Sequence, residues 1–169
     1  MRADARPAVS PVGRLAALLA TWFGVGLIRP APGTWGSLAG LLLAWPILAF
    51  AGAWWLAAAV VIVVLVGIWA AGRHEATMGH PDPGRVVIDE VAGMWITLLP
   101  ACATWHHLLV AFVAFRVIDI LKPWPASWAD RRLKGGFGIM VDDVMAGVYA
   151  ALCVIGWRWI WGWSESCPT

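Results

Sequence analysis

The chain has 169 residues, of which 61% are hydrophobic and 13% are charged, and its formal net charge is +2. Soluble domains carry roughly a quarter charged residues, so this composition excludes an ordinary soluble domain and indicates a membrane protein. No Lys/Arg stripe with interleaved aromatic residues accompanies the small net charge, which argues against nucleic-acid binding.

The N-terminal segment is basic and precedes an apolar stretch, a pattern that secretory signal peptides share. Its basic residues are Arg2, Arg6 and Arg14. The apolar stretch runs into a Pro-rich break at residues 29–34 and then into a further long hydrophobic run. This continuation favours a retained first helix rather than a cleaved signal.

Hydrophobic segments separated by Gly- and Pro-rich breaks predict an all-α, polytopic membrane bundle of about six helices, some of them short or re-entrant. The expected bounds are about 14–28, 36–50, 53–72, 86–100, 104–121 and 140–163. One domain, 14–163, contains all of them, between a flexible N-terminal tail at 1–13 and a C-terminal tail at 164–169.

The longest apolar run, from Gly36 to Gly72, has no charged residue in 37 positions. As a single helix it would be roughly 55 Å long, whereas the hydrocarbon core of a bilayer is about 30 Å thick. The run must therefore fold back on itself. We expect the reversal at residues 50–53, after a first pass interrupted by Pro46.

The second uncharged stretch, Val91 to Phe115, has 25 residues and is compatible with one spanning helix or with a hairpin that turns near residues 100–107. Basic residues gather in the connecting regions on either side of it: Arg73, Arg85, Arg116, Lys122, Arg131, Arg132 and Lys134. The positive-inside rule puts both regions on the cytoplasmic face. The stretch must then cross twice or dip and return, which favours the hairpin.

Two pairs of adjacent carboxylates lie at the edges of apolar segments: Asp89 with Glu90, and Asp142 with Asp143. Ionised groups beside hydrocarbon are costly and usually mark ion binding, proton transfer or catalysis. Two unit charges 4 Å apart repel by about 4 kcal/mol at an effective dielectric near 20, and a bound cation removes that penalty. The helix macrodipole explains one isolated acid, whereas two pairs on one predicted side favour a shared site for a hard cation such as Mg²⁺. Gly93, one turn after the first pair, indicates a close approach by a neighbour.

A third polar cluster places Arg116, Asp119 and Lys122 at three-residue spacing on one helix face. Arg116 offers a bidentate fork suited to phosphate, and a local ion pair with Asp119 is compatible with that role. Pro123 predicts that the helix ends near residue 121, which frees the Lys122 ammonium to reach a ligand.

The segment Pro32 to Ser37 reads as a helix start with Thr34 as N-cap, and such an end suits an anion, although capping alone explains the pattern. Acids together with Arg and Lys at a bilayer edge indicate a lipid phosphate. The residues by themselves therefore predict metal-assisted phosphoryl chemistry on a membrane substrate.

Four strings in the same order resemble the phosphatidylglycerophosphatase A family of bacteria: PGTWGS (32–37), DPGRVVIDEVAGMW (82–95), FRVIDILKPWP (115–125) and GGFGIMVDDVMAG (135–147). The resemblance covers residues 14 to 163. It implies a helical bundle in the bacterial inner membrane, with a Mg²⁺-dependent active site on the cytoplasmic face. Its substrate would be phosphatidylglycerophosphate, whose terminal phosphate is removed to give phosphatidylglycerol.

By motif match, the resemblance implies metal and catalytic roles for Asp89, Glu90, Asp142 and Asp143, a catalytic role for Asp119 and a supporting role for Asp82. It implies phosphate binding by Arg116, Lys122, Thr34, Ser37 and Arg85. In the expected mechanism a carboxylate positions or deprotonates water for in-line attack while Mg²⁺ bridges the acids and the phosphomonoester. An aspartyl-phosphate intermediate is the alternative route.

Two other functions use similar acids. A CDP-alcohol phosphotransferase also combines membrane carboxylates with Mg²⁺, but its leading Asp-Gly-x-x-Ala-Arg element is absent from this chain. A non-enzymatic cation carrier would bind ions in transit at the same positions. Mg²⁺-dependent phosphate release by the purified protein separates a phosphatase from a carrier, and release of CMP from a CDP-lipid would indicate the phosphotransferase.

Overall fold

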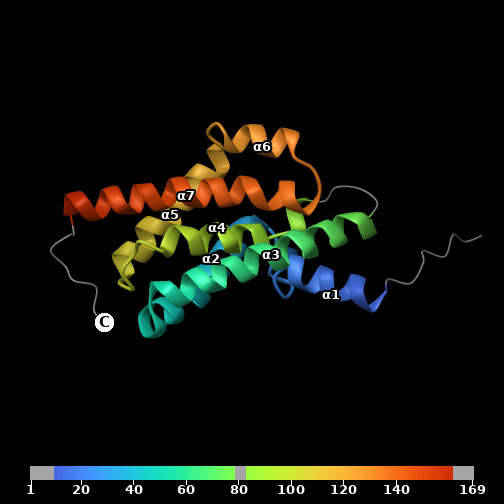
Figure 1. Ribbon diagram of the computed structural model, residues 1–169, viewed down its shortest axis with the longest axis horizontal. Helices are drawn as coiled ribbons and strands as arrows, with labels where there is room; N and C mark the ends of the chain where they lie inside the picture. The colour runs from blue at the N-terminus through green and yellow to red at the C-terminus, as the bar shows by residue number, and fades with distance from the viewer. Residues whose placement is uncertain (1–9, 79–82, 162–169) are drawn as a thin grey trace, which may run out of the picture.

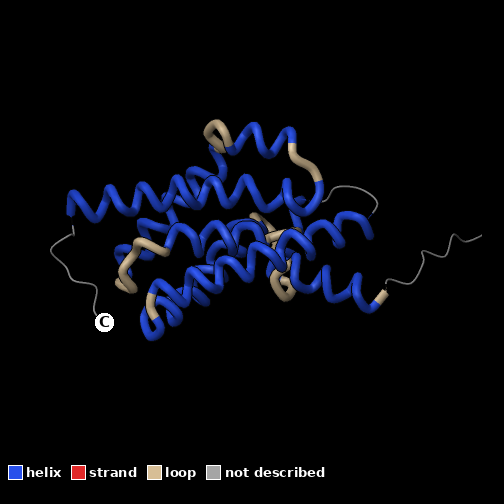
Figure 2. Tube along the Cα trace, in the orientation of Figure 1, coloured by secondary structure: helices blue, strands red, loops and turns tan. Residues whose placement is uncertain are grey.

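The computed structural model describes residues 10–78 and 83–161, and every regular element in these ranges is helical (Figure 2). The seven α-helices of this part of the chain are α1 (Pro11–Ala20), α2 (Pro32–Pro46), α3 (Ala53–Met78), α4 (Ile88–Leu98), α5 (Trp105–Leu121), α6 (Ala126–Arg132) and α7 (Gly135–Trp161). Two short 3₁₀ turns, η1 (Val25–Leu27) and η3 (Pro83–Arg85), and a π-helical turn, η2 (Ile47–Ala51), lie between them. The predicted all-α class is confirmed.

The bundle is elongated, and α4 runs through its middle (Figure 1). α4 packs against α7, α2 and α3, while α5 packs against α7 as well. Most residues of α4 are buried. A helix that is apolar around most of its circumference is expected to be surrounded by other helices, and this position brings both ends of α4 into contact with several elements.

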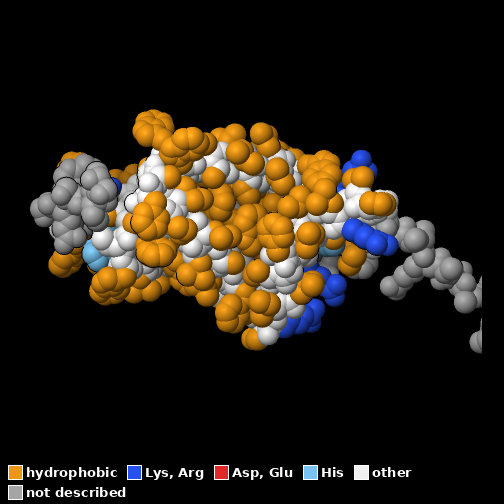
Figure 3. Space-filling model, turned by 90° about the horizontal axis from the view of Figure 1, so that it is seen from below, with side chains coloured by type: hydrophobic (Ala, Val, Ile, Leu, Met, Phe, Trp, Pro, Cys, Tyr) orange, Lys and Arg blue, Asp and Glu red, His pale blue; other side chains and the backbone are white. Residues whose placement is uncertain are grey.

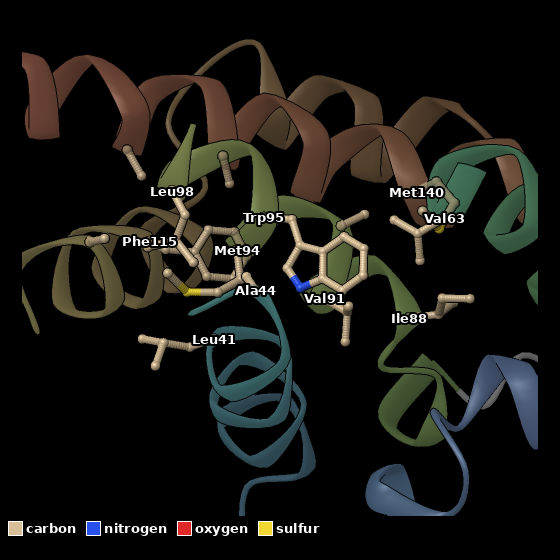
Figure 4. Packing of buried hydrophobic residues seen from close by; sticks show 14 of the residues in the cluster. Leu41, Ala44, Val63, Ile88, Val91, Met94, Trp95, Leu98, Phe115 and Met140 are labelled. Atoms are coloured by element: carbon tan, nitrogen blue, oxygen red, sulfur yellow. The ribbon is translucent and has the colours of Figure 1, made fainter. Parts of the chain in front are cut away.

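The core around α4 joins helices that are far apart in the sequence (Figure 4). Met94 and Trp95 of α4 lie with Phe115 of α5 and Leu41 of α2 in one buried cluster. The Nε1 group of Trp95 donates a hydrogen bond of 2.7 Å to the backbone oxygen of Gly40. Because a buried indole N–H without an acceptor is costly, this bond holds α4 in register with α2.

Three helical segments of the described residues are long and apolar enough to cross a membrane: Pro32–Ala51, Ala53–Met78 and Gly135–Trp161. The first two are joined at Gly52, whose φ of +89° suits glycine and reverses the chain at the predicted place. The regular part of α2 ends at Pro46, and η2 continues it to the reversal. The predicted fold-back of this uncharged run is therefore confirmed.

The second uncharged stretch forms α4 and α5, as the hairpin interpretation predicts. α4 has 11 residues, which corresponds to roughly 16 Å and is too short to cross a hydrocarbon core. A Cβ atom on Gly33 would meet both Glu90, at the start of α4, and Arg116, near the end of α5. The start of α4 and the end of α5 therefore lie at the same end of the bundle.

α4 and α7 approach each other closely at two glycines. A Cβ atom on Gly147 would lie 2.5 Å from the backbone oxygen of Gly93, and one on Gly93 would lie 2.6 Å from the backbone oxygen of Asp143 and even closer to the Phe115 ring. Only glycine permits backbones to come this close. The close approach predicted at Gly93 is confirmed, and the neighbours are α5 and α7.

Several helix bounds differ from the prediction. α1 ends at Ala20 rather than near residue 28, because Trp22, Phe23 and Gly24 adopt positive φ and turn the chain. α3 continues to Met78 instead of ending near 72. α7 begins at Gly135 rather than near 140, so its acidic pair lies well inside the helix rather than at its start.

The short helix α6 was not predicted from the sequence. Ala126 and Ala129 are buried where α6 packs against α7, whereas Trp128, Asp130 and Arg131 are exposed. α1 likewise begins at Pro11, inside the expected N-terminal tail. Residues 1–9 of that tail, and all of the expected C-terminal tail, lie outside the described residues.

Replacement of Gly147 by Ala tests the α4–α7 contact. The added methyl group meets the backbone of α4, and overpacking of this kind costs about 1–3 kcal/mol. We expect Gly147→Ala to lower the thermal unfolding midpoint of the detergent-purified protein. Gly156→Ala, on the same helix with nothing within 4 Å of the added atom, should leave the midpoint unchanged or raise it. Equal midpoints in the two variants would contradict this account of the contact.

Candidate active site

Three carboxylates from two helices form the centre of the site. Asp89 and Glu90 stand in the first turn of α4, and Asp143 comes from α7. One ligand oxygen from each of the three lies within 4.8 Å of the others. Asp143 is buried, and the other two are half-buried. The glycine contact between α4 and α7, one turn further along both helices, brings these acids together.

Asp142, the neighbour of Asp143, faces a different partner. Consecutive helical residues point about 100° apart, so the two acids of this pair do not share one direction. Asp142 accepts a hydrogen bond of 2.5 Å from the Lys122 ammonium. Its second oxygen, Oδ1, is buried and has no hydrogen-bond partner among the described residues, and Oε2 of Glu90 is in the same condition. The site therefore contains buried carboxylate oxygens that are available to a ligand.

Arg116 is held beside this centre by two helices. Its Nη1 atom donates a hydrogen bond of 2.7 Å to Asp119 on α5 and another, of 3.3 Å, to the Ser37 hydroxyl on α2. The Ser37 hydroxyl in turn donates to the backbone oxygen of Gly33 at 2.8 Å. The local ion pair between Arg116 and Asp119, which the sequence left open as compatible with phosphate binding, is present. Both charged side chains are mostly buried, with 16% and 12% of their surface exposed.

Lys122 follows the last residue of α5 and takes the left-handed conformation, with φ of +43°. The helix thus ends at Leu121, as Pro123 predicts. The Lys122 ammonium lies between Asp142 and Asp130 of α6, at 2.5 and 2.7 Å. Burial by itself lowers the pKa of Lys122, but the hydrogen bonds to Asp130 and Asp142 outweigh burial and raise that pKa above its ordinary value. Lys122 is therefore positively charged in this position.

A cavity of about 470 Å³ opens over these groups. Its polar walls come from α3, α4, α5, α6 and α7. The charged lining residues are Glu75, Asp89, Glu90, Asp119, Lys122, Asp130, Lys134, Asp142 and Asp143. Apart from these, the start of α7 contributes Gly135 and Gly138. Four of the predicted acids and Asp119 therefore surround one cavity.

Two of the predicted residues do not join this cluster. Thr34 is not the N-cap of α2, because that position is taken by Ala31 in the left-handed conformation, and Thr34 lies inside the helix. Arg85 lines a separate cavity with Arg14 and Thr21. Asp82 lies outside the described residues. Among the predicted phosphate ligands, the structure thus brings together Arg116, Lys122 and Ser37.

Other residues of the site were not selected from the sequence. Gly33 is one of them: a Cβ atom at this position would collide with Oε1 of Glu90 and lie 3.3 Å from Nη1 of Arg116. Asp130, Glu75 and Lys134 line the cavity although they belong to segments that carry no recognisable motif. Its position next to a predicted helix start could have marked Gly33 as a site residue. The other three depend on how α3 and α6 pack, which no local pattern indicates.

The donor set suits a hard divalent cation. All three clustered ligands are carboxylate oxygens, and one of them, Glu90, keeps a buried oxygen without a partner among the described residues. Mg²⁺ is typically bound through one or two carboxylates together with water and substrate phosphate. Asp89, Glu90 and Asp143 are the residues that could hold such an ion, with Asp142 turned toward Lys122 instead.

The fold and the site define an all-helical membrane protein with a carboxylate-lined cavity at one end of its bundle and two cations beside the acids. The model of the family described as phosphatidylglycerophosphatase A matches residues 18–158. A phosphatidylglycerophosphatase A of Haemophilus influenzae is 45% identical over 139 residues, which cover 81% of this chain and 85% of that protein. The chain belongs to the phosphatidylglycerophosphatase A family, a family of phosphatases.

Two further relatives are similar over most of their length. A phosphatidylglycerophosphatase A of Escherichia coli is 42% identical over 146 residues, or 84% of each chain. A protein of Bacteroides thetaiotaomicron that carries the provisional name phosphatidylinositol-3-phosphatase is 41% identical over 165 residues, covering 93% of this chain and 99% of its own. No solved structure matches the chain.

Gly33 offers a test of the site that leaves the core alone. An added Cβ atom would displace Oε1 of Glu90 and crowd Arg116, and a displacement of about 1 Å in a catalytic group can cost roughly 100-fold in rate. We expect Gly33→Ala to reduce phosphate release from a lipid phosphomonoester by at least about tenfold while its unfolding midpoint stays near that of the wild type. Gly156→Ala serves as the control, and a wild-type rate for Gly33→Ala would show that Gly33 has no part in the site.

Proposed function

We propose that this protein hydrolyses the terminal phosphomonoester of phosphatidylglycerophosphate to phosphatidylglycerol and phosphate, with Mg²⁺ as cofactor. The observation that carries the proposal is the grouping of Asp89, Glu90 and Asp143 within 4.8 Å, with Lys122 in the same cavity wall and Arg116 close to Glu90, in a chain of this family. Carboxylates alone would repel a phosphate, and cations alone would bind it without activating it. The combination suits a phosphate that enters together with a divalent ion.

The ion would be held by Asp89, Glu90 and Asp143. When bound, Mg²⁺ would polarise the phosphoryl oxygens and neutralise the charge that develops on them. Arg116 and Lys122 would contact the remaining phosphoryl oxygens, since guanidinium and ammonium groups both donate to phosphate. Asp119 and Ser37 orient Arg116 through the hydrogen bonds that the structure contains.

The chemical step requires that a nucleophile attack phosphorus opposite the glycerol oxygen. If water attacks, its oxygen forms the new P–O bond, a carboxylate takes its proton, and the released glycerol oxygen is protonated to a hydroxyl. Asp142 is a candidate for the proton acceptor because its Oδ1 is buried without a partner among the described residues. Attack by an aspartate, followed by hydrolysis of the aspartyl phosphate, gives the same products and uses the same residues.

We further propose that the protein spans the bacterial inner membrane several times, with its site on the cytoplasmic face. Hydrophobic side chains cover the middle of the face seen in Figure 3, and Lys and Arg side chains gather at the end where α1 begins and α3 ends. The positive-inside rule assigns this end to the cytoplasm. The Arg116–Lys134 region, which carries the cations of the site, belongs to the same side in this arrangement.

The deciding experiment measures phosphate release from phosphatidylglycerophosphate by the detergent-purified protein, with Mg²⁺ and with EDTA. We expect release that requires Mg²⁺ and that is reduced at least about 100-fold in Asp89→Asn and Asp143→Asn, because each variant removes a charged ligand from the cation site. Both variants should unfold at or above the wild-type midpoint, because each removes one charge from a group of carboxylates that repel one another. A carrier would release no phosphate with any metal, and release of CMP from a CDP-lipid would instead indicate a phosphotransferase.

Glu75→Gln is the matched control for these acid variants. Glu75 lines the same cavity but lies outside the group of three carboxylates. The Mg²⁺ concentration that gives half-maximal activity should therefore change little in Glu75→Gln. An equal loss of activity in Asp89→Asn, Asp143→Asn and Glu75→Gln would mean that the cavity acts through its overall charge. The assignment of Asp89, Glu90 and Asp143 as metal ligands would then fail.

A second candidate substrate comes from the relative in Bacteroides thetaiotaomicron, whose name refers to phosphatidylinositol 3-phosphate. That lipid also carries a phosphomonoester on a polyol headgroup, so the same residues would serve. Parallel assays with the two lipids decide between them. A higher kcat/KM for the inositol lipid would replace the proposed substrate while leaving the proposed chemistry in place.

The topology is tested by labelling single cysteines in a cysteine-free variant with a membrane-impermeant maleimide. Arg73→Cys and Arg131→Cys, both exposed near the site end, should react only when the cytoplasmic face is accessible. Phe50→Cys, which precedes the reversal at Gly52 and is 84% exposed, should react from the opposite face. Labelling of Arg73→Cys and Arg131→Cys from different sides would rule out the proposed arrangement.

A further inference from the structure

Lys134 differs from the other cations at the site because it has no acidic partner. Arg116 is paired with Asp119, and Lys122 with Asp130 and Asp142. Lys134 lines the same cavity as Lys122. Within residues 10–78 and 83–161, however, its side chain makes neither a hydrogen bond nor an ion pair. An ammonium group that lines an acidic cavity without a partner is available to an anion.

The position of Lys134 adds to this availability. It is exposed and immediately precedes α7, where Gly135 adopts φ of +68° and begins the helix. Gly135 and Gly138 line the cavity together with Lys134, and the Gly138 amide donates to the Lys134 backbone oxygen at 3.4 Å, so the ammonium is the group of this segment that is open to an anion. In Figure 1 the connection from α6 to α7 lies at the end of the bundle where α3 ends.

The cavity has room for more than one phosphate. Its volume of about 470 Å³ falls within the range of ligand-sized pockets, roughly 300–1,000 Å³. The substrate of the proposed reaction carries a second anion, the phosphodiester that joins the polyol headgroup to the diacylglycerol.

We propose that the Lys134 ammonium binds this phosphodiester and thereby selects lipids that carry both a phosphodiester and a phosphomonoester. A lipid with a phosphomonoester alone, such as phosphatidic acid, leaves Lys134 without a ligand. This inference rests on the proposed function, because it concerns the same cavity. It concerns the class of lipid that is accepted and leaves the metal site and the chemical step unchanged.

The test compares kcat/KM for phosphatidylglycerophosphate and for phosphatidic acid in mixed micelles, using the full-length protein with saturating Mg²⁺. We expect Lys134→Ala to lower kcat/KM for phosphatidylglycerophosphate by roughly tenfold, the effect of one charge-assisted hydrogen bond. Most of this loss should appear in KM. The value for phosphatidic acid should not change, and Lys134→Arg should restore most of the preference because it keeps the charge.

Arg132→Ala is the matched control, since Arg132 is an exposed cation two residues earlier that does not line the cavity. Arg132→Ala should change kcat/KM for neither lipid. The inference is overturned if Lys134→Ala lowers kcat/KM equally for both lipids, which would indicate a general electrostatic effect. It is also overturned if kcat/KM changes for neither lipid. Wild-type protein that releases no phosphate from either lipid would overturn the proposed function itself, and the inference with it.

Discussion

The acid cluster depends on the close contact between α4 and α7. Two glycines, Gly93 and Gly147, let the backbones of these helices approach to a distance that any larger residue would prevent. The carboxylates lie about one turn from this contact on both helices, so the separation of the backbones sets the separation of the ligand oxygens. Hydrocarbon offers no hydrophobic force that would press two apolar helices together, and small residues with close packing supply the association instead.

The same contact makes the site electrostatically expensive in the absence of a ligand. Three carboxylates whose ligand oxygens lie within 4.8 Å repel one another, and partial burial strengthens the repulsion. The surrounding residues offset only part of it. Lys122 pairs with Asp142 and Asp130, and Arg116 pairs with Asp119. The ion pairs among the described residues include none for the central three, although Arg116 lies near Glu90. The site thus separates acids that hold cations from acids that are free to bind one.

Much of the helical framework follows from local rules. The length of the uncharged run required a reversal, and Gly52 is the residue near its middle that tolerates positive φ. Pro123 terminates α5 at Leu121 for a similar local reason. α6 escaped prediction because seven residues with two arginines and an aspartate show no apolar period, and only its contact with α7 makes Ala126 and Ala129 buried. The early start of α7 escaped for a different reason, since its three glycines at 135–138 resemble a loop.

The residues of the candidate site were largely predictable from the sequence, but the partner that each of them contacts was not. Motifs indicated the acids, Arg116 and Lys122, whereas the orientation of each side chain depends on packing. Asp142 and Asp143 are equivalent in the sequence, and the rotation of α7 decides that Asp143 joins α4 while Asp142 meets Lys122. The expected cap at Thr34 failed because the left-handed Ala31 begins the helix three residues earlier. Arg85 is close to the acids in sequence, yet η3 directs it to another cavity.

The two cations proposed to bind phosphate, Arg116 and Lys122, already form ion pairs with acids of the protein before a substrate binds. If Arg116 moved away from Asp119, a mostly buried carboxylate would lose its partner. A phosphate therefore binds to the intact pair and uses the remaining donors of the guanidinium. Lys122 has three donors and two are used, which leaves one for a phosphoryl oxygen. The acids that hold these cations therefore fix their geometry in advance, and fixed donors reduce the ordering entropy that binding a flexible lipid headgroup would otherwise require.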